Sequence, residues 1–153
     1  MLYKQTVILR KIDYVDVVSA FQNLEFVKFL IKWQPVKIVN WDGIYNGDIA
    51  HFKFWFFSWH NFEVKHHLYQ FNKNQLSFED KGINLPLGIK SWNHQHIVIK
   101  EDDGIIIKDH INFSHHYYLM GLMLYPLLVF PIFVRKILYK KYFRRRKNVY
   151  TDY

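Results

Sequence analysis

The residues with the clearest capacity for chemistry are two histidines and an aspartate in the second half of the chain. His94 and His96 are one residue apart in the segment SWNHQHIVI, and Asp109 follows in IIIKDHINF. Alternate side chains of a β-strand lie on the same face, so a strand would place both imidazoles together. Two imidazoles and a carboxylate could bind a metal ion, exchange protons as acid and base, or hold the polar end of a ligand.

Two further titratable residues fall on strand faces that are otherwise apolar. His66 alternates with Phe62 and Val64, and Asp80 alternates with Phe78. A carboxylate buried on such a face must be paired or it takes up a proton. Histidines are its natural partners, so we expect all five titratable residues to form one buried cluster on neighbouring strands.

Three interpretations of this cluster stay open. It could be a structural network that fixes strand register, a recognition site that orients the polar end of an apolar ligand, or a site of acid–base or metal chemistry. We favour the first two and expect no tightly bound metal and no cofactor. The adjacent pairs His66-His67 and His115-His116 are poor chelates, because neighbouring side chains on a strand diverge. Nucleophilic catalysis has no support, since the sequence has no nucleophile elbow, phosphate loop or HExxH motif.

The composition of the chain is that of one domain with a real core. Its 153 residues are 50% apolar and 20% aromatic, which suits a single domain over residues 1–147 with a short tail at 148–153. The chain has no cysteine, which excludes disulfides and thiolate sites and fits a reducing compartment. The N-terminal segment lacks an apolar stretch typical of a secretory signal, so we expect a cytoplasmic location.

The positive charge is concentrated near the C-terminus. The net charge is +8, and the segment 135–147 holds eight basic and no acidic residues, which leaves 13 basic against 13 acidic residues elsewhere. A uniformly basic surface is therefore excluded, and we expect no nucleic-acid partner. Weak contact of this basic segment with an anionic membrane is the one charge-driven partnership that the sequence suggests.

Hydrophobic periodicity and turn residues predict one strand, two short helices, six strands in hairpin succession, and a long final helix. Asp13 could cap the first helix, Asn23 marks a break, and Pro35 ends the pair. The residues 82–88 are expected as a loop. The predicted strands are 2–9, 36–43, 48–57, 61–71, 75–80, 90–100 and 105–113, and the helices are 13–31, divided at Asn23, and 117–145.

The final helix begins with an uncharged segment, residues 117–134, that could be a membrane anchor or the cover of a sheet. We favour the cover, because the inner sheet face, with Phe54 and Leu68, would otherwise meet water. In that case residues 117–134 form the buried half of the helix and the basic residues from Arg135 lie at its exposed end. Pro126 and Pro131 predict kinks within it.

This order of elements resembles the helix-grip fold of the SRPBCC superfamily, which includes START lipid-transfer domains, birch-pollen-allergen-like proteins and polyketide cyclases. More narrowly, it is similar to bacterial ligand-binding proteins described as cell-division-inhibitor-like. The residues that carry this similarity are Trp92, His94, His96 and Asp109 in the strands and Phe133, Arg135 and Phe143 in the helix. The resemblance implies an α+β fold in which a curved seven-stranded antiparallel sheet, two short helices and a long C-terminal helix enclose a cavity.

The cavity that the resemblance implies would bind an apolar small molecule or lipid, without catalysis. One alternative is a cyclase- or hydratase-type enzyme that uses the His/Asp cluster, and another is a membrane-attached interaction protein that uses residues 117–147. The oligomeric state and the ligand are not specified. The expected ligand-binding residues are Trp92, His94, His96, Asp109, His66, Asp80, Phe54, Phe78 and Tyr125.

Overall fold

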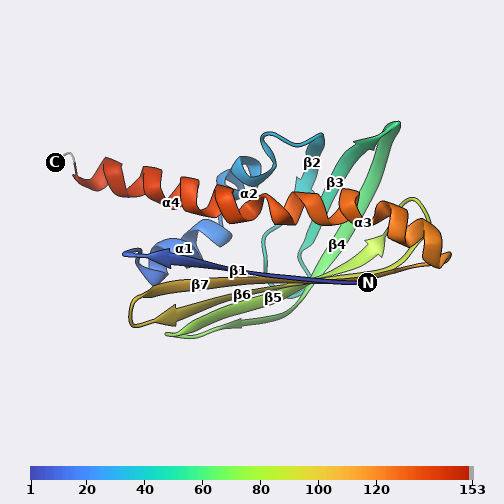
Figure 1. The fold of residues 1–153 in the computed structure, drawn as a ribbon. Coiled ribbons are helices and arrows are strands. Elements are labelled where there is room, and N and C mark those ends of the chain that lie inside the picture. The colour runs from blue at the N-terminus through green and yellow to red at the C-terminus, as the bar shows by residue number, and fades with distance from the viewer. Residues whose placement is uncertain (152–153) are drawn as a thin grey trace.

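Seven antiparallel strands form one curved sheet, and a long helical segment runs across one of its faces (Figure 1). The computed structural model describes the backbone of residues 1–151 and the side chains of residues 1–144. The element order and the α+β fold class agree with the sequence prediction. The elements are β1 (Leu2–Arg10), α1 (Tyr14–Phe21), α2 (Leu24–Ile31), β2 (Val36–Trp41), β3 (Ile49–Phe56), β4 (Ser58–Phe71), β5 (Gln75–Asn84), β6 (Ile89–Glu101), β7 (Gly104–His115), α3 (Tyr118–Phe133) and α4 (Arg135–Thr151).

The strand order is β1-β7-β6-β5-β4-β3-β2. Strands β2 to β7 are a meander, and β1 joins it by pairing with the last strand. The turn into β7 needs glycine at position 104, where φ is +146° and a Cβ atom would clash with the carbonyl oxygen of Leu9. This close approach lets β1 and β7 pair to the end of both strands.

The two short helices meet at Asn23, as the sequence predicts. Its side-chain oxygen accepts a hydrogen bond of 2.8 Å from the backbone N–H of Glu25 and so caps α2. Asp13 occupies the position before α1 but makes no capping hydrogen bond with its side chain. Val17 and Phe21 turn inward from α1, which anchors this helix pair over one end of the sheet.

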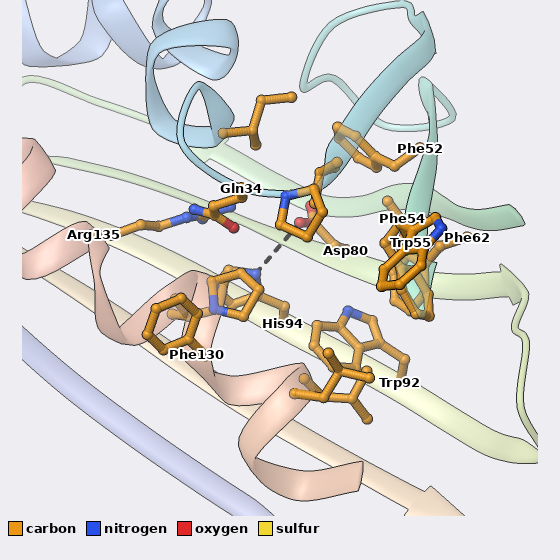
Figure 2. A pocket seen from close by; sticks show the side chains of 18 of the residues that line it. Gln34, Phe52, Phe54, Trp55, Phe62, Asp80, Trp92, His94, Phe130 and Arg135 are labelled. Atoms are coloured by element: carbon orange, nitrogen blue, oxygen red, sulfur yellow. Dashed lines mark ion pairs between the residues drawn. The ribbon is translucent and has the colours of Figure 1, made fainter. Parts of the chain in front are cut away.

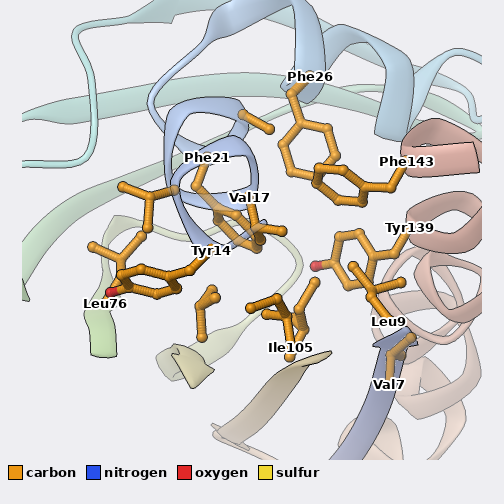
Figure 3. Close-up of a cluster of buried hydrophobic side chains, with 14 of the residues drawn as sticks. Val7, Leu9, Tyr14, Val17, Phe21, Phe26, Leu76, Ile105, Tyr139 and Phe143 are labelled. Atoms are coloured by element: carbon orange, nitrogen blue, oxygen red, sulfur yellow. The ribbon is translucent and has the colours of Figure 1, made fainter. Parts of the chain in front are cut away.

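The hydrophobic core at this end joins α1, α2 and α4 to the sheet (Figure 3). The ring of Phe26 lies 5.9 Å from that of Tyr139 and 5.7 Å from that of Phe143, measured between centroids. A second cluster under α3 includes Trp92 and Phe113. The helical segment therefore closes the sheet through two separate sets of contacts.

The closing helix differs from the expected single helix 117–145. A turn at Val134 separates α3 from α4, and the N–H of Ile137 bonds to the carbonyl of Val134, three residues back, at 3.1 Å. Pro131 has no N–H to give to the preceding turn, so the ladder is already weakened just before the break. Helix α4 continues to Thr151, beyond the start of the expected tail, and residues 152–153 lie outside the described part of the chain.

Burial along this segment does not divide at Arg135 as expected, because both α3 and the described part of α4 have buried and exposed residues. Much of α3 is exposed, with Leu119 at 69%, whereas Tyr139 and Phe143 of the basic half are 0% and 2% exposed. Arg135 also turns inward, with its side chain 17% exposed. The prediction was wrong because a covering helix buries one stripe along its whole length rather than one of its halves.

Two other local expectations are corrected. Strand β5 continues to Asn84, so the first three residues of the expected loop 82–88 are strand and only residues 85–88 connect β5 to β6. Leu68 does not belong to the inner face, because it has a φ of +52° within an irregularity of the β4–β5 pairing and is exposed. The irregularity shifts the alternation of side chains at that point.

Candidate functional site

A cavity of about 510 Å³ lies between α3, the connection from α2 to β2, and strands β3 to β6 (Figure 2). The aromatic side chains of β3 and β4, including Phe54 and Phe62, gather at one end in this view, whereas Phe130 of α3 lies on the other side. Gln34 and Arg135 lie toward the other end, with Asp80 and His94 between them. The cavity therefore has an apolar part and a polar part.

Four of the nine expected ligand-binding residues line this cavity, namely Phe54, Asp80, Trp92 and His94. Trp92 holds its indole edge-on to Phe62, with centroids 5.1 Å apart. These residues lie on the inner face of the sheet, where the alternation of side chains along each strand predicts them.

The other five expected residues do not line the cavity. His66, His96 and Asp109 are buried and belong to the polar cluster behind the cavity wall. Phe78 stacks on His96 within the first core cluster, with centroids 4.5 Å apart. Tyr125 packs on the second cluster, and its hydroxyl donates a hydrogen bond of 3.3 Å to the carbonyl of Leu2.

The polar cluster assembles because its members are cross-strand neighbours. Asp80 of β5 pairs in register with His66 of β4 and His94 of β6, and Asp109 of β7 pairs with His96 of β6. Antiparallel partners on one face have side chains within contact distance. The sequence expectation of one buried cluster on neighbouring strands is thus met.

Two carboxylates and two imidazoles form the centre of this cluster. The Nε2 atom of His94 lies 3.1 Å from Oδ1 of Asp109, and Nε2 of His96 lies 3.0 Å from Oδ2 of Asp80. The Nδ1 atom of each ring faces the other carboxylate, at 3.6 Å for His94 to Asp80 and 3.2 Å for His96 to Asp109. Each histidine therefore spans both aspartates.

Three members of the site were not expected there. Gln5 donates hydrogen bonds of 2.8 Å from Nε2 to Oδ2 of Asp109 and to the carbonyl of Ile132. The hydroxyl of Tyr139 also bonds to Asp109, and Nη1 of Arg135 lies 4.0 Å from Oδ1 of the same carboxylate. Both residues could have been found from the sequence pattern. Gln5 lies two residues before buried Val7 on the same face of β1, and Tyr139 lies four residues after Arg135 on the same face of α4.

Burial and neighbouring charge move the pKa values of the cluster in different directions. Burial alone would raise the pKa of Asp109, but hydrogen bonds from His94 and His96 outweigh it and hold that pKa well below its ordinary value. The pKa of Asp80 is also lowered. Burial raises it, but the charge and hydrogen bond of His96 have the larger, opposite effect. Both carboxylates are therefore ionised at neutral pH.

The pKa values of the two central histidines are shifted in opposite directions. Burial and the nearby charge of His96 lower the pKa of His94 to about 4, despite its hydrogen bond to Asp109. For His96, burial lowers the pKa, but the charge of Asp80 and the hydrogen bonds to both aspartates raise it above the ordinary value. Of the two rings, His96 is therefore the one that takes up a proton first as the pH falls.

The charges of the cluster then cancel. Once His96 carries a proton, the two carboxylates of Asp80 and Asp109 face one protonated imidazole and the guanidinium of Arg135. Burial lowers the pKa of Arg135, but Tyr139 and Asp109 raise it above its ordinary value. Buried charges are tolerated when they are paired in this way.

Asp80, His94 and His96 could also hold a metal, since one ligand atom from each lies within 4.8 Å of the others. Such a donor set suits zinc or iron, but a dication would add charge to a cluster that is already balanced.

Comparison with known proteins identifies the fold. No protein-family model matches the sequence, and no curated protein matches it. Among solved structures, norcoclaurine synthase from Thalictrum flavum, in complex with dopamine and hydroxybenzaldehyde, superposes with a TM-score of 0.58 at 17% identity, over 92% of this chain and 83% of that one. The allergen Ara h 8.0201 gives a TM-score of 0.60 at 10% identity, over 95% of this chain and 98% of that one.

A third similar structure is the di-domain ARO/CYC protein StfQ from the steffimycin biosynthetic pathway. It gives a TM-score of 0.70 at 12% identity, over 96% of this chain and 51% of that chain. The described chain thus corresponds to about half of that di-domain protein. At these identities the likeness establishes a shared fold, with a sheet gripped by a C-terminal helix.

Proposed function

We propose that this protein, which has the helix-grip fold of the SRPBCC superfamily, binds a small apolar molecule that carries one polar group. The cavity of about 510 Å³ falls within the range of about 300–1,000 Å³ typical of small-molecule sites. Its walls are mostly apolar and aromatic, which favours a ligand with an acyl or ring body.

The observation that carries the proposal is a set of unpartnered polar atoms at one part of the cavity. Oε1 of Gln34 and Nε of Arg135 are buried and have no hydrogen-bond partner among the described residues, and Oδ1 of Asp80 has only a long contact of 3.4 Å with Nδ1 of His66. All three cavity residues, Gln34, Asp80 and Arg135, line the same pocket. Buried polar groups are normally satisfied, so these atoms mark where a ligand's polar group would bind. Two acceptors and one donor suit a group that both donates and accepts, such as a hydroxyl, a carboxylic acid or an amide.

The comparisons support this proposal at the level of the fold. The norcoclaurine synthase structure holds dopamine and hydroxybenzaldehyde, so the fold is able to admit small molecules with an aromatic body and polar groups. The nature of the ligand here is argued from this chain's own cavity.

The direct test is extraction of the native protein followed by mass spectrometry of the bound molecule, together with titration by the fluorescent probe anilinonaphthalene sulfonate. Leu127→Trp should weaken probe binding, because Leu127 lines the cavity and the larger indole would occupy part of it. Val15→Trp is the matched control, since Val15 is 74% exposed on α1. Equal probe binding by both variants, with no copurified molecule, would show that the cavity is not a ligand site.

A second candidate function is acid–base catalysis in the same cavity, favoured by His94 alone. Its imidazole is neutral above pH 4, is oriented by the buried carboxylate of Asp109, and lines the cavity. A neutral imidazole held by a carboxylate can act as a general base. Once a ligand is known, His94→Gln separates the two functions. If the protein is an enzyme, the variant should still bind the ligand but no longer convert it to product. If it is a binding protein, neither the unaltered chain nor the variant should form product.

A further inference from the structure

The outward face of α3 carries a continuous apolar stripe that the rest of the described chain leaves exposed. Its members lie on the side opposite the buried residues Leu124, Leu128 and Ile132, and most are separated by three, four or seven residues, the spacing of one helix face. The last member lies in α4, just beyond the break at Val134. Such a stripe on a water-facing helix is unusual unless something binds it. The exposed members are Leu119, Leu122, Met123, Phe130, Phe133 and Ile137.

The same face becomes positively charged as the helix continues into α4. Lys140, Lys141 and Arg144 follow Ile137 at the same helical spacing and are exposed. Lys136 places its ammonium 5.3 Å from the ring of Phe133. Between residues 110 and 151 the sequence contains no aspartate or glutamate, so no acidic neighbour on this segment offsets the charge.

We propose that this α3–α4 face, from Leu119 to Arg144, docks on the anionic surface of a lipid bilayer. A helix that lies in the membrane interface buries an apolar face at the acyl boundary while its basic residues contact anionic headgroups. Each lysine or arginine near such a surface strengthens binding, and salt weakens this part of the interaction. The apolar stripe and the basic residues that follow it match these two parts of a membrane surface.

The geometry distinguishes docking from spanning. The segment Tyr118–Arg144 is long and apolar enough to cross a membrane, and 28% of its most apolar window is buried within the protein. However, Arg135, Tyr139 and Phe143 hold the same segment to the polar cluster and the core. A membrane span would pull these three residues out of the domain, whereas interfacial docking uses only side chains that are already exposed.

Charge also argues against a second copy of the chain as the partner. A two-fold contact sets the same surface against itself, so it would bring two basic α4 segments into one interface to which residues 110–151 contribute no acidic side chain. An anionic surface has the opposite sign and removes this repulsion.

The proposed docking face adjoins the cavity. Phe130 belongs both to the exposed stripe and to the cavity lining, and Trp55 of β3, which is 49% exposed, lines the opposite border of the cavity. Phe57, at the tip of the β3–β4 hairpin, is 86% exposed and contacts Trp55, with ring centroids 6.4 Å apart. Docking would bring this border of the cavity to the bilayer, although the docking itself does not depend on what the cavity holds.

The test is co-sedimentation of the full chain with phosphatidylcholine vesicles, with and without about one-third phosphatidylglycerol. The combined change Leu122→Gln, Met123→Gln and Phe133→Gln removes half of the apolar stripe. Its matched control is Val15→Gln, Val39→Gln and Ile83→Gln, which alters three exposed apolar residues on other elements. Circular dichroism of each variant checks that it is folded.

A second pair of variants tests the charge. Lys140→Ser with Lys141→Ser should weaken binding to the anionic vesicles about thirtyfold, the equivalent of about 2 kcal/mol. Lys73→Ser with Lys90→Ser removes the same charge from other exposed positions and should weaken binding less.

We expect the unaltered chain to bind the anionic vesicles and be released by alkaline carbonate, and the stripe variant to lose binding while its control keeps it. Three results would overturn the proposal: no sedimentation of the unaltered chain with anionic vesicles, equal binding by the stripe variant and its control, or retention after carbonate extraction, which indicates a span. Sedimentation velocity adds a fourth. A dimer that the stripe variant dissociates, with no vesicle binding, would assign the face to a second copy.

Discussion

The hydroxyl of Tyr139 lies 3.3 and 3.2 Å from the two carboxylate oxygens of Asp109, and both residues are completely buried. Tyr139 comes from α4 and Asp109 from β7, so this contact ties the closing helix to the sheet. The same carboxylate accepts the hydrogen bond of His94 at the cavity. Closure of the fold and the electrostatics of the candidate site therefore depend on one shared group.

Replacement of Tyr139 by phenylalanine should lower the free energy of unfolding by about 1.5–3 kcal/mol, the usual value of a hydrogen bond to a charged group. The ring and its packing on Phe26 remain, so the loss reports the hydroxyl alone. Chemical denaturation measures it. Tyr118→Phe is the control, because Tyr118 is exposed on α3, and an equal effect of both changes would contradict the structural role of the contact.

The stability of the protein should fall as the pH is lowered from about 6.5 to about 4. In this window the unfolded chain protonates His94 at its ordinary pKa of 6.5, whereas the folded chain keeps it neutral down to a pKa of about 4. The unfolded state then binds more protons, and His94 by itself lowers the free energy of unfolding by at most about 3 kcal/mol. His96 does not offset this loss. Its pKa is raised in the folded state, so the stability that it contributes is fully present below pH 6.5 and is lost only as the pH rises.

Urea unfolding at a series of pH values checks this prediction. His94→Gln should reduce the decrease between pH 6.5 and 4, since it removes one of the groups that titrate there. Part of the decrease should remain, because burial also lowers the pKa values of His66 and His110. His116→Gln, at an exposed position, is the matched control and should retain the slope. An unchanged slope in the His94 variant would place the titration elsewhere.

The purified protein should contain no stoichiometric zinc or iron, and His96→Ala should leave the metal content unchanged. The physical reason is the charge balance of Asp80 and Asp109 against protonated His96 and Arg135. Elemental analysis of protein that has not been exposed to chelators measures it. One equivalent of metal that the His96 variant loses would refute the charge argument and favour the enzyme.

Phe143→Ala should destabilise the domain by about 3–5 kcal/mol, the usual cost of removing a buried aromatic side chain. Phe143 is 2% exposed and packs on Phe26, although it stands among basic residues. Ile137→Ala, on the same helix but 68% exposed, should change stability by less than about 0.5 kcal/mol. Thermal or chemical unfolding compares the two, and a reversed order would mean that the basic half does not anchor the helix.

The sequence alone determined the strands, their order and the inner position of the titratable residues. Alternation of side chains is a local property, so the parity of His94, His96 and Asp109 with apolar neighbours was enough to place them on the inner face. Short turns between successive strands likewise made them neighbours in an antiparallel sheet. The order of elements also carried the resemblance to the helix-grip fold.

Only the tertiary structure decided which face of the closing helix turns inward. Helix α3 is apolar all round, so its sequence contains no preferred inner side, and the choice depends on what it packs against. The same holds for the partners of Asp109, because Gln5 and Tyr139 are 104 and 30 residues away in the chain. The cavity lining, which includes Phe54 but not Phe78, was likewise decided by where the helix leaves a gap over the sheet. These contacts join distant segments, and no local pattern specifies the distance between them.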